Sequence, residues 1–125
     1  MMTQEQFDNL QRGDQFLVNN GILQRLGGEG YEVHVYFGRF QERYDFGIYI
    51  NGEGGGSGSP TKEDLLSGIF EYEKIEKDHP SYVEAAVEYS QQFGQFIDTL
   101  NTLAEKEANG EEVTSEDIQR VLKQK

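Results

Sequence analysis

The chain contains no cysteine and no tryptophan, has only two prolines, and carries fewer than half as many basic as acidic residues. Without cysteine, the protein has no disulfide bond, no thiolate zinc site and no cysteine nucleophile. The apolar runs are too short to cross a bilayer, and the first twenty residues carry acids and lack the apolar stretch of a signal peptide. We therefore expect a cytoplasmic protein without a membrane segment.

The shortage of basic residues gives a net charge of −12 and an isoelectric point near 4.5. Residues 53–117 contain 16 acids and four lysines, so this segment carries the whole net charge. Such a field repels nucleic acid and anionic lipid, and it favours cations or basic protein surfaces. Solubility is the alternative explanation, because acidic surfaces also keep small domains in solution.

Alternating apolar residues predict an antiparallel β-meander in the first half of the chain. Four strands are expected at residues 16–18, 22–26, 31–37 and 44–50. If Phe37 pairs with Tyr44 across the loop between them, the apolar residues of all four strands gather on one face. That predicted face contains Phe16, Val18, Ile22, Leu26, Tyr31, Val33, Val35, Phe37, Tyr44, Phe46, Ile48 and Ile50.

Helix signals lie on both sides of this meander. Thr3 and Gln6 fit a capping box that begins an N-terminal helix. A Gly/Ser-rich linker is expected at residues 51–59, followed by an acidic helical part at residues 60–125. Helices are predicted to begin at Pro60, at a capping box of Ser81 and Glu84, and at Thr114 with Asp117 three residues later. The second of these helices is expected to run to Ala108.

At 125 residues, these elements fit a single α+β domain. We expect an N-terminal helix, a four-stranded antiparallel meander, and three helices that pack on one sheet face as a two-layer sandwich. The sequence leaves open whether the helices that begin near residues 60 and 81 are separate.

The glycine-rich segment lacks the features of a phosphate or calcium site. A P-loop requires Gly-Lys-Ser/Thr at the start of its helix, whereas this helix begins with Ser59-Pro60. Asn51 and Glu53 offer oxygen ligands for calcium, but without the ligand spacing of an EF-hand.

Catalytic and metal-binding motifs are also incomplete. Glu32, His34 and Asp45 share one predicted sheet face, which makes them the best candidate metal ligands, although a packed or solvated His34 is the simpler interpretation. Asp45-Phe46-Gly47 matches a kinase metal motif, but it lies in a predicted strand and its companion motifs are missing. We therefore expect no enzymatic activity, no catalytic residue, no metal site and no cofactor.

Two groups of residues are candidates for contact with another protein. The outer sheet face is expected to carry Leu17, Leu23, Tyr36 and Tyr49, where a sheet that buries one face is normally polar. The predicted loop at residues 38–43 combines an aromatic residue with two arginines, a composition typical of interface hot spots.

The acidic helices provide the third candidate surface. Carboxylates about one turn apart on rigid helices imitate the phosphates of nucleic acid toward a basic groove. Together with the tyrosine face and the loop, the predicted partner-binding residues are Glu63, Asp64, Glu71, Asp78, Glu84, Glu88, Asp98, Arg39, Phe40, Arg43, Tyr36 and Tyr49.

The leading hypothesis is a non-enzymatic acidic protein-binding module that docks on a basic, nucleic-acid-handling protein and does not bind nucleic acid itself. Inhibitors encoded by phages and mobile elements, and immunity proteins against nuclease toxins, have this size and charge. One alternative is a module that binds calcium, another metal or a small ligand at the glycine-rich segment or beside His34. A second alternative is a dimeric chaperone or assembly protein that dimerises through the tyrosine face and the helix that begins near Ser81. The sequence leaves open whether the protein is a monomer or a homodimer.

Overall fold

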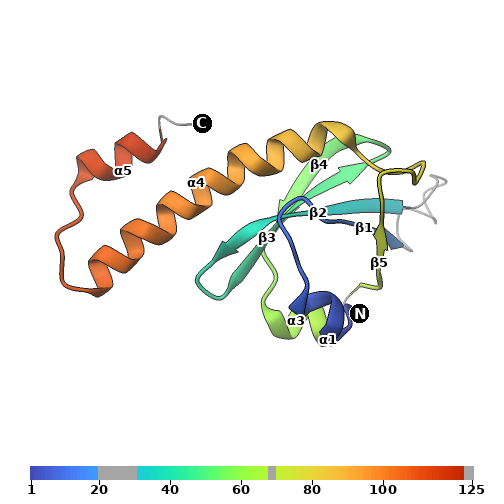
Figure 1. The fold of residues 1–125 in the computed structure, drawn as a ribbon, viewed down its shortest axis with the longest axis horizontal. Coiled ribbons are helices and arrows are strands. Elements are labelled where there is room, and N and C mark those ends of the chain that lie inside the picture. The colour runs from blue at the N-terminus through green and yellow to red at the C-terminus, as the bar shows by residue number, and fades with distance from the viewer. Residues whose placement is uncertain (20–30, 68–69, 123–125) are drawn as a thin grey trace.

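The computed structural model describes residues 1–19, 31–67 and 70–122 (Figure 1). The helices and strands are, in chain order, α1 (Gln4–Asp8), β1 (Gln15–Asn19), β2 (Tyr31–Phe40), β3 (Arg43–Ile50), β4 (Glu53–Gly58), α3 (Lys62–Ser67), β5 (Tyr72–Ile75), α4 (Glu84–Ala108) and α5 (Ser115–Leu122). The strands form one antiparallel sheet in the order β4-β3-β2-β1-β5. The predicted α+β class is confirmed.

Helices cover both faces of this sheet, so the prediction of one buried face is wrong. The N-terminal part of α4 crosses one face, hereafter the α4 face (Figure 1). Its core residues are Val33, Val35, Phe37, Ile75, Val83, Ala86 and Ile97. Helices α1 and α3 lie against the opposite face, where the core consists of Met2, Phe16, Val18, Tyr36, Tyr44, Phe46, Leu65 and Tyr72.

The register of β2 against β3 explains this difference. Phe40 pairs with Arg43, so the turn is shorter than predicted and Tyr36 stands opposite Phe46. Tyr44 pairs with Arg39 instead of the predicted Phe37, and beyond an irregularity between Tyr36 and Gly38 the register differs from the predicted one by one residue. Because side chains alternate along a strand, a slip of one residue moves the apolar set of β3 to the other face.

The strand order also differs from the predicted meander. β1 pairs directly with β2, with Gln15 opposite Val35, so no strand separates residues 16–18 from residues 31–37. The predicted strand at residues 22–26 and Leu23 lie outside the described residues. The other edge of β1 pairs with β5, where Val18 stands opposite Tyr72.

Two segments predicted as linker and helix instead form edge strands. Residues 53–58 of the predicted linker form β4, which pairs with β3. The helix predicted from Pro60 is represented by α3, and Tyr72 lies in β5 with its side chain buried. In both cases an open sheet edge supplies backbone hydrogen bonds that outweigh the local propensity of the segment.

The other helices match their predicted positions more closely. Thr3 and Gln6 form the predicted capping box of α1, and Thr114 and Asp117 exchange the corresponding bonds at α5. The capping box predicted at Ser81 is absent, because the N-cap of α4 is Val83 without a side-chain hydrogen bond.

Gln15 fixes the start of α4 instead. The Val83 N–H donates to Gln15 Oε1 over 2.8 Å, and Gln15 Nε2 donates to the Val83 carbonyl over 2.9 Å. The Gln15 side chain is fully buried, and both ends of its amide are satisfied. One glutamine thus binds the N-terminus of α4 to β1.

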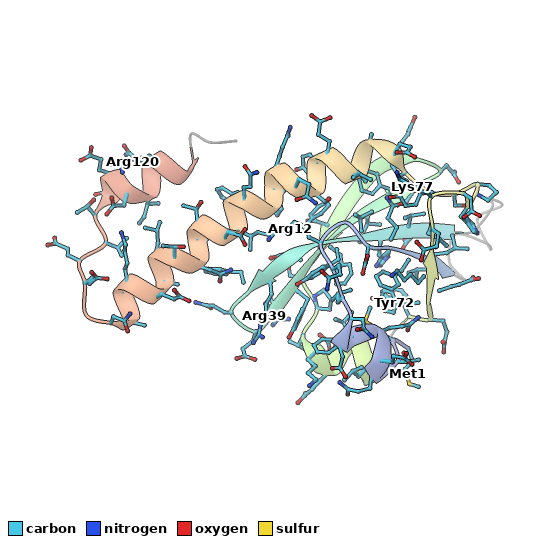
Figure 2. All side chains as sticks on the ribbon, in the orientation of Figure 1. Met1, Arg12, Arg39, Tyr72, Lys77 and Arg120 are labelled. Atoms are coloured by element: carbon cyan, nitrogen blue, oxygen red, sulfur yellow. The ribbon has the colours of Figure 1, made fainter. Side chains whose placement is uncertain are left out.

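Arg12 binds the middle of α4 to the sheet. Its Nε donates to the Phe37 carbonyl over 2.8 Å, and its terminal nitrogens donate to the two carboxylate oxygens of Asp98 over 3.1 and 2.8 Å. A Cβ at Gly94 would lie only 2.1 Å from Arg12 Nε, so this glycine provides the space for the guanidinium. Arg12 lies between α4 and the sheet in Figure 2.

Beyond this contact, α4 extends past the β2–β3 hairpin (Figure 1). Asn101 Nδ2 donates to the Arg39 carbonyl over 2.8 Å, close to the point where the helix leaves the sheet. Residues 102–122, hereafter the helical arm, contain the rest of α4 and α5. Because α5 packs against α4 instead of the sheet, the prediction of three helices on one sheet face is wrong.

The Arg12 contact yields a first testable prediction. Arg12→Lys should lower the free energy of unfolding by about 1–3 kcal/mol, since an ammonium group cannot replace the forked contact to Asp98 together with the bond to Phe37. Urea unfolding followed by circular dichroism measures this loss. Arg120→Lys is the matched control, because Arg120 lies 3.8 Å from Glu116 at an exposed position and should change stability by less than about 0.5 kcal/mol. Equal stability of the two variants would refute the role of Arg12.

Candidate functional site

The predicted acidic residues do not share one surface. Glu63 and Asp64 belong to α3 on one side of the sheet, whereas Glu84 and Glu88 belong to α4 on the other side. The sheet therefore separates the two groups, and a single partner groove cannot contact both at once.

Several of these acids already bind groups of the same chain. Glu71 lies 3.3 Å from the N-terminal amino group, and Asp98 binds Arg12. Asp64 accepts the Thr61 N–H over 3.1 Å, and this backbone bond is the main cause of a lowered Asp64 pKa. Glu63, Asp78, Glu84 and Glu88 are exposed.

The helical arm carries a dense excess of acids that the prediction did not single out. Residues 102–122 contain six acids and two bases. Glu105, Glu107, Glu111, Glu112 and Glu116 are all exposed. Side chains of the arm extend outward from α4 and α5 in Figure 2, with Arg120 labelled among them.

The predicted arginine–phenylalanine loop does not form one cluster, although Arg39 and Arg43 are exposed. β2 continues through Phe40, whose partly buried side chain packs against the core under α4. The Arg39 guanidinium lies over the Tyr44 ring, 5.3 Å from its centroid, and Arg43 donates to the Ser59 carbonyl over 3.2 Å. The three side chains therefore have separate partners within the chain.

The two tyrosines predicted for one exposed patch lie on opposite faces of the sheet. Tyr36 is buried in the α1 and α3 side of the core, 5.4 Å from the Phe46 ring, and burial raises its pKa to about 12. Tyr49 lies on the α4 face, partly buried. Of these two tyrosines, Tyr49 lines an accessible hollow, whereas Tyr36 is buried in the core.

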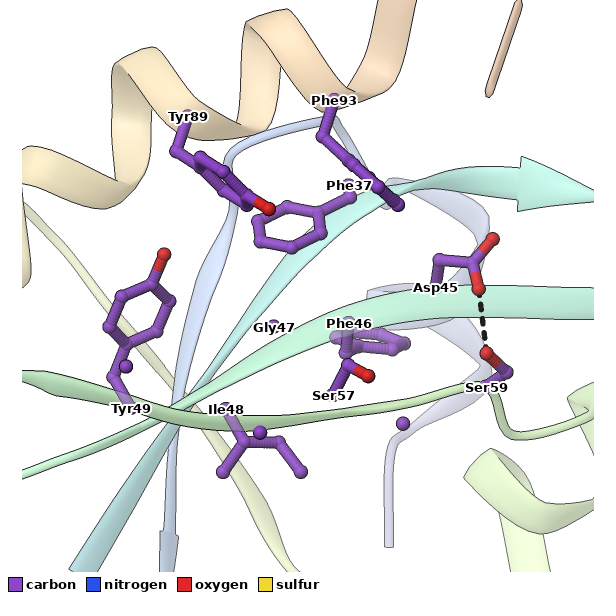
Figure 3. A pocket seen from close by; sticks show the side chains of 13 residues that line it. Phe37, Asp45, Phe46, Gly47, Ile48, Tyr49, Ser57, Ser59, Tyr89 and Phe93 are labelled. Carbon is purple, nitrogen blue, oxygen red and sulfur yellow. Dashed lines mark hydrogen bonds between the residues drawn. The ribbon is translucent and has the colours of Figure 1, made fainter. Parts of the chain in front are cut away.

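That hollow is a pocket of about 400 Å³ between α4 and the strands β3 and β4. Five aromatic residues line it, three from the sheet and two from α4: Phe37, Phe46, Tyr49, Tyr89 and Phe93 (Figure 3). The Tyr89 and Phe93 rings stack at an interplanar angle of 12°, and the Phe37 centroid lies 5.4 Å from each of them. We refer to it as the aromatic pocket.

Glycines create the space for this arrangement. A Cβ at Gly47 would lie 2.3 Å from the Phe37 ring, so the ring can lie across β3 only above a glycine. On β4, Gly54, Gly56 and Gly58 line the pocket with backbone alone. Because these positions carry no side chains, the pocket stays open on the β4 side.

The carboxylate of the aromatic pocket lies at one end. Asp45 lies there and accepts a hydrogen bond of 2.6 Å from the Ser59 hydroxyl (Figure 3). Burial, followed by the nearby Tyr89 phenol, raises the Tyr49 pKa above its ordinary value, so this phenol is neutral at pH 7. Asp45 is the charged residue among the described residues that line the pocket.

Two features of the sequence indicate this pocket, although neither alone predicts it. Tyr89 and Phe93 are four residues apart on one helix, where their side chains meet on one face. Gly47 interrupts an aromatic strand, and glycine in a strand marks a close approach of another group. The sequence does not show that β4 pairs with β3, and this pairing brings the glycine-rich segment to the pocket.

The predicted metal ligands are not assembled. Glu32 and His34 lie in the core below α1 and α3, with Glu32 Oε2 2.9 Å from His34 Nε2, whereas Asp45 lies in the aromatic pocket on the other face. Within residues 1–19, 31–67 and 70–122, no group of three or more His, Cys, Asp or Glu side chains is placed to hold a metal ion.

The buried His34 yields a second prediction. Burial lowers its pKa below the ordinary 6.5, and this effect outweighs the opposing contact with Glu32. The unfolded chain therefore binds the proton more readily, so the native state should be fully stable above about pH 6.5 and lose stability as the pH falls below that value.

The measurement is urea unfolding at pH 7.5, 6.5 and 5.5, followed by circular dichroism because the chain has no tryptophan. His34→Gln should reduce the slope of stability against pH by as much as about 1.4 kcal/mol per pH unit, the value for one proton. An unchanged slope in His34→Gln would exclude the buried neutral histidine.

Comparisons with known proteins identify no relative. No protein-family model matches the chain, and searches of curated proteins and of solved structures return no significant match. Among the described helices, none is both long enough and apolar enough to span a membrane.

Proposed function

We propose that this protein is a non-enzymatic acidic protein-binding module that docks on the basic surface of a nucleic-acid-handling protein. The observation that carries the proposal is the helical arm, which extends beyond the sheet with six acids against two bases (Figure 1). The arm replaces the broader acidic surface expected from the sequence, because the sheet divides that surface.

The composition of the arm suits contact with a basic partner. Its exposed carboxylates attract positive charge over a distance of about one Debye length, roughly 8–10 Å at physiological salt. Ile118 on α5 is 46% exposed, so an apolar side chain is accessible among the acids. Charge supplies the rate and specificity of association, whereas burial of apolar surface supplies stability.

The helix that carries the arm is also held in a fixed relation to the sheet. α4 is one continuous helix of 25 residues. It is bound by Gln15 at its N-cap Val83 and by Arg12 near its middle at Asp98. A helix anchored at two points presents its free end with little conformational entropy to lose on binding.

A variant of the arm with a matched control tests this proposal. The arm variant replaces Glu105, Glu107, Glu111 and Glu112 by Gln, and the control variant replaces Glu42, Glu63, Glu73 and Glu76 by Gln. Both sets are exposed, and both change the net charge from −12 to about −8, so a difference between them reports position instead of total charge.

The measurement begins with capture of partners from a cell lysate at about 50 mM salt, followed by titration of each identified partner as a purified protein. The wild type and the control variant should recover the same basic protein, whereas the arm variant should bind it at least about tenfold more weakly. The affinity of the wild type should fall steeply between about 50 and 300 mM salt, and duplex DNA should compete. Equal binding by both variants, or binding that does not respond to salt, would contradict the proposal.

Homodimerisation through Ile118 is the competing use of the arm. Light scattering of the wild type across a hundredfold range of concentration distinguishes the two. A mass that doubles in the wild type and stays that of one chain in Ile118→Glu would identify the arm as a contact between two copies.

A further inference from the structure

An open sheet edge lies directly beside the aromatic pocket. β4 ends the sheet and, among the described strands, has a neighbour only on its β3 side. Four of its six residues are glycine, and residues 53–57 are exposed. Such an edge is usually protected by lysine or proline, and glycine in a strand permits close approach of a second backbone.

The chemistry of the pocket favours a cationic group. The faces of aromatic rings attract cations, and a guanidinium group also stacks on them. Asp45 adds a full negative charge at one end of the pocket, and its carboxylate retains acceptor sites besides the one used by Ser59. The net charge of −12 repels anions from the same site.

The size of the pocket fits one long side chain. Sites for drug-sized ligands have volumes of about 300–1,000 Å³, and this pocket, at about 400 Å³, lies near the lower limit. A segment paired with β4 would direct every second side chain to the α4 face, because side chains alternate along a strand. One such side chain would point toward Tyr89, Phe93 and Asp45.

We propose that the outer edge of β4 pairs with an extended segment of the basic partner protein, and that this segment places one arginine side chain in the aromatic pocket beside Asp45. The inference rests on the proposed function for the basic character of the partner, but it uses a different part of the surface. Addition of a strand to an open sheet edge supplies affinity through backbone hydrogen bonds, and the pocket supplies specificity. Arginine is favoured over lysine because its planar guanidinium stacks on rings and binds a carboxylate with two hydrogen bonds.

The test uses pools of synthetic pentapeptides instead of an unidentified partner. Each peptide has a central arginine and, at the other four positions, residues drawn from Val, Ile, Thr and Tyr, which favour strands. One matched pool carries citrulline, which keeps the shape of arginine without its charge. A second matched pool carries N-methyl groups on the two peptide bonds flanking the arginine, which removes donors needed for strand pairing.

Titration of the uniformly ¹⁵N-labelled protein, followed by its amide NMR signals, measures both affinity and location. The arginine pool should shift the signals of residues 53–58 and of Tyr89, and it should bind at least about tenfold more tightly than either matched pool. Asp45→Asn should weaken binding of the arginine pool about tenfold, and Tyr89→Ala should also weaken it. The control Asp78→Asn removes the same charge at an exposed site outside the pocket and should leave binding unchanged.

The comparison of pools in the wild-type protein needs no variant, so it holds even if Asp45→Asn is unstable. Equal binding of the arginine and citrulline pools, or absence of binding by all pools, would overturn the proposal. Chain-to-chain pairing through β4, detected by light scattering, would overturn it in favour of a second copy as the occupant. The four-site arm variant should bind the arginine pool normally, so loss of the partner in that variant and loss of the peptide in Asp45→Asn are separate results.

Discussion

The position of α4 depends on the short segment that contains Arg12 and Gln15. Gln15 binds the first turn of the helix through the Val83 peptide, and Arg12 binds its middle through Asp98 while also holding the Phe37 carbonyl. Both contacts come from the chain immediately before and within β1. The two features with functional interest depend on this placement, since the N-terminal half of α4 provides one wall of the aromatic pocket and its C-terminal end becomes the helical arm.

Because both faces of the sheet are buried, little of the sheet remains accessible to a partner. α1 and α3 cover one face, and α4 covers the central strands of the other, so neither face offers a broad open patch. β4 is the exception because its glycines fill little space. The result is a narrow aromatic pocket beside an unprotected strand edge, a combination suited to an extended peptide more than to a flat protein surface.

The electrostatic character of the protein depends on arrangement as much as on total charge. Asp64, Glu71 and Asp98 belong to a highly acidic segment, yet each binds a group of the same chain. Asp64 binds Thr61 at the start of α3, Glu71 lies beside the N-terminal amino group, and Asp98 binds Arg12. The arm also has an excess of acids, but it extends away from the sheet. An acidic chain thus uses part of its charge to maintain the fold and presents another part to solvent.

The α+β class, the capping boxes at Thr3 and Thr114 and the long helix up to Ala108 followed from the sequence, because these features depend on neighbours within a few residues. The register of β2 against β3, the pairing of β4 and β5, and the division of acids by the sheet were decided by tertiary structure. A strand and a glycine-rich segment gain most of their hydrogen bonds from residues distant in the chain, and a change of one residue in that pairing moves every side chain to the other face. The aromatic pocket belongs to this second class, since Phe37, Tyr89 and Asp45 meet only after α4 is fixed to the sheet.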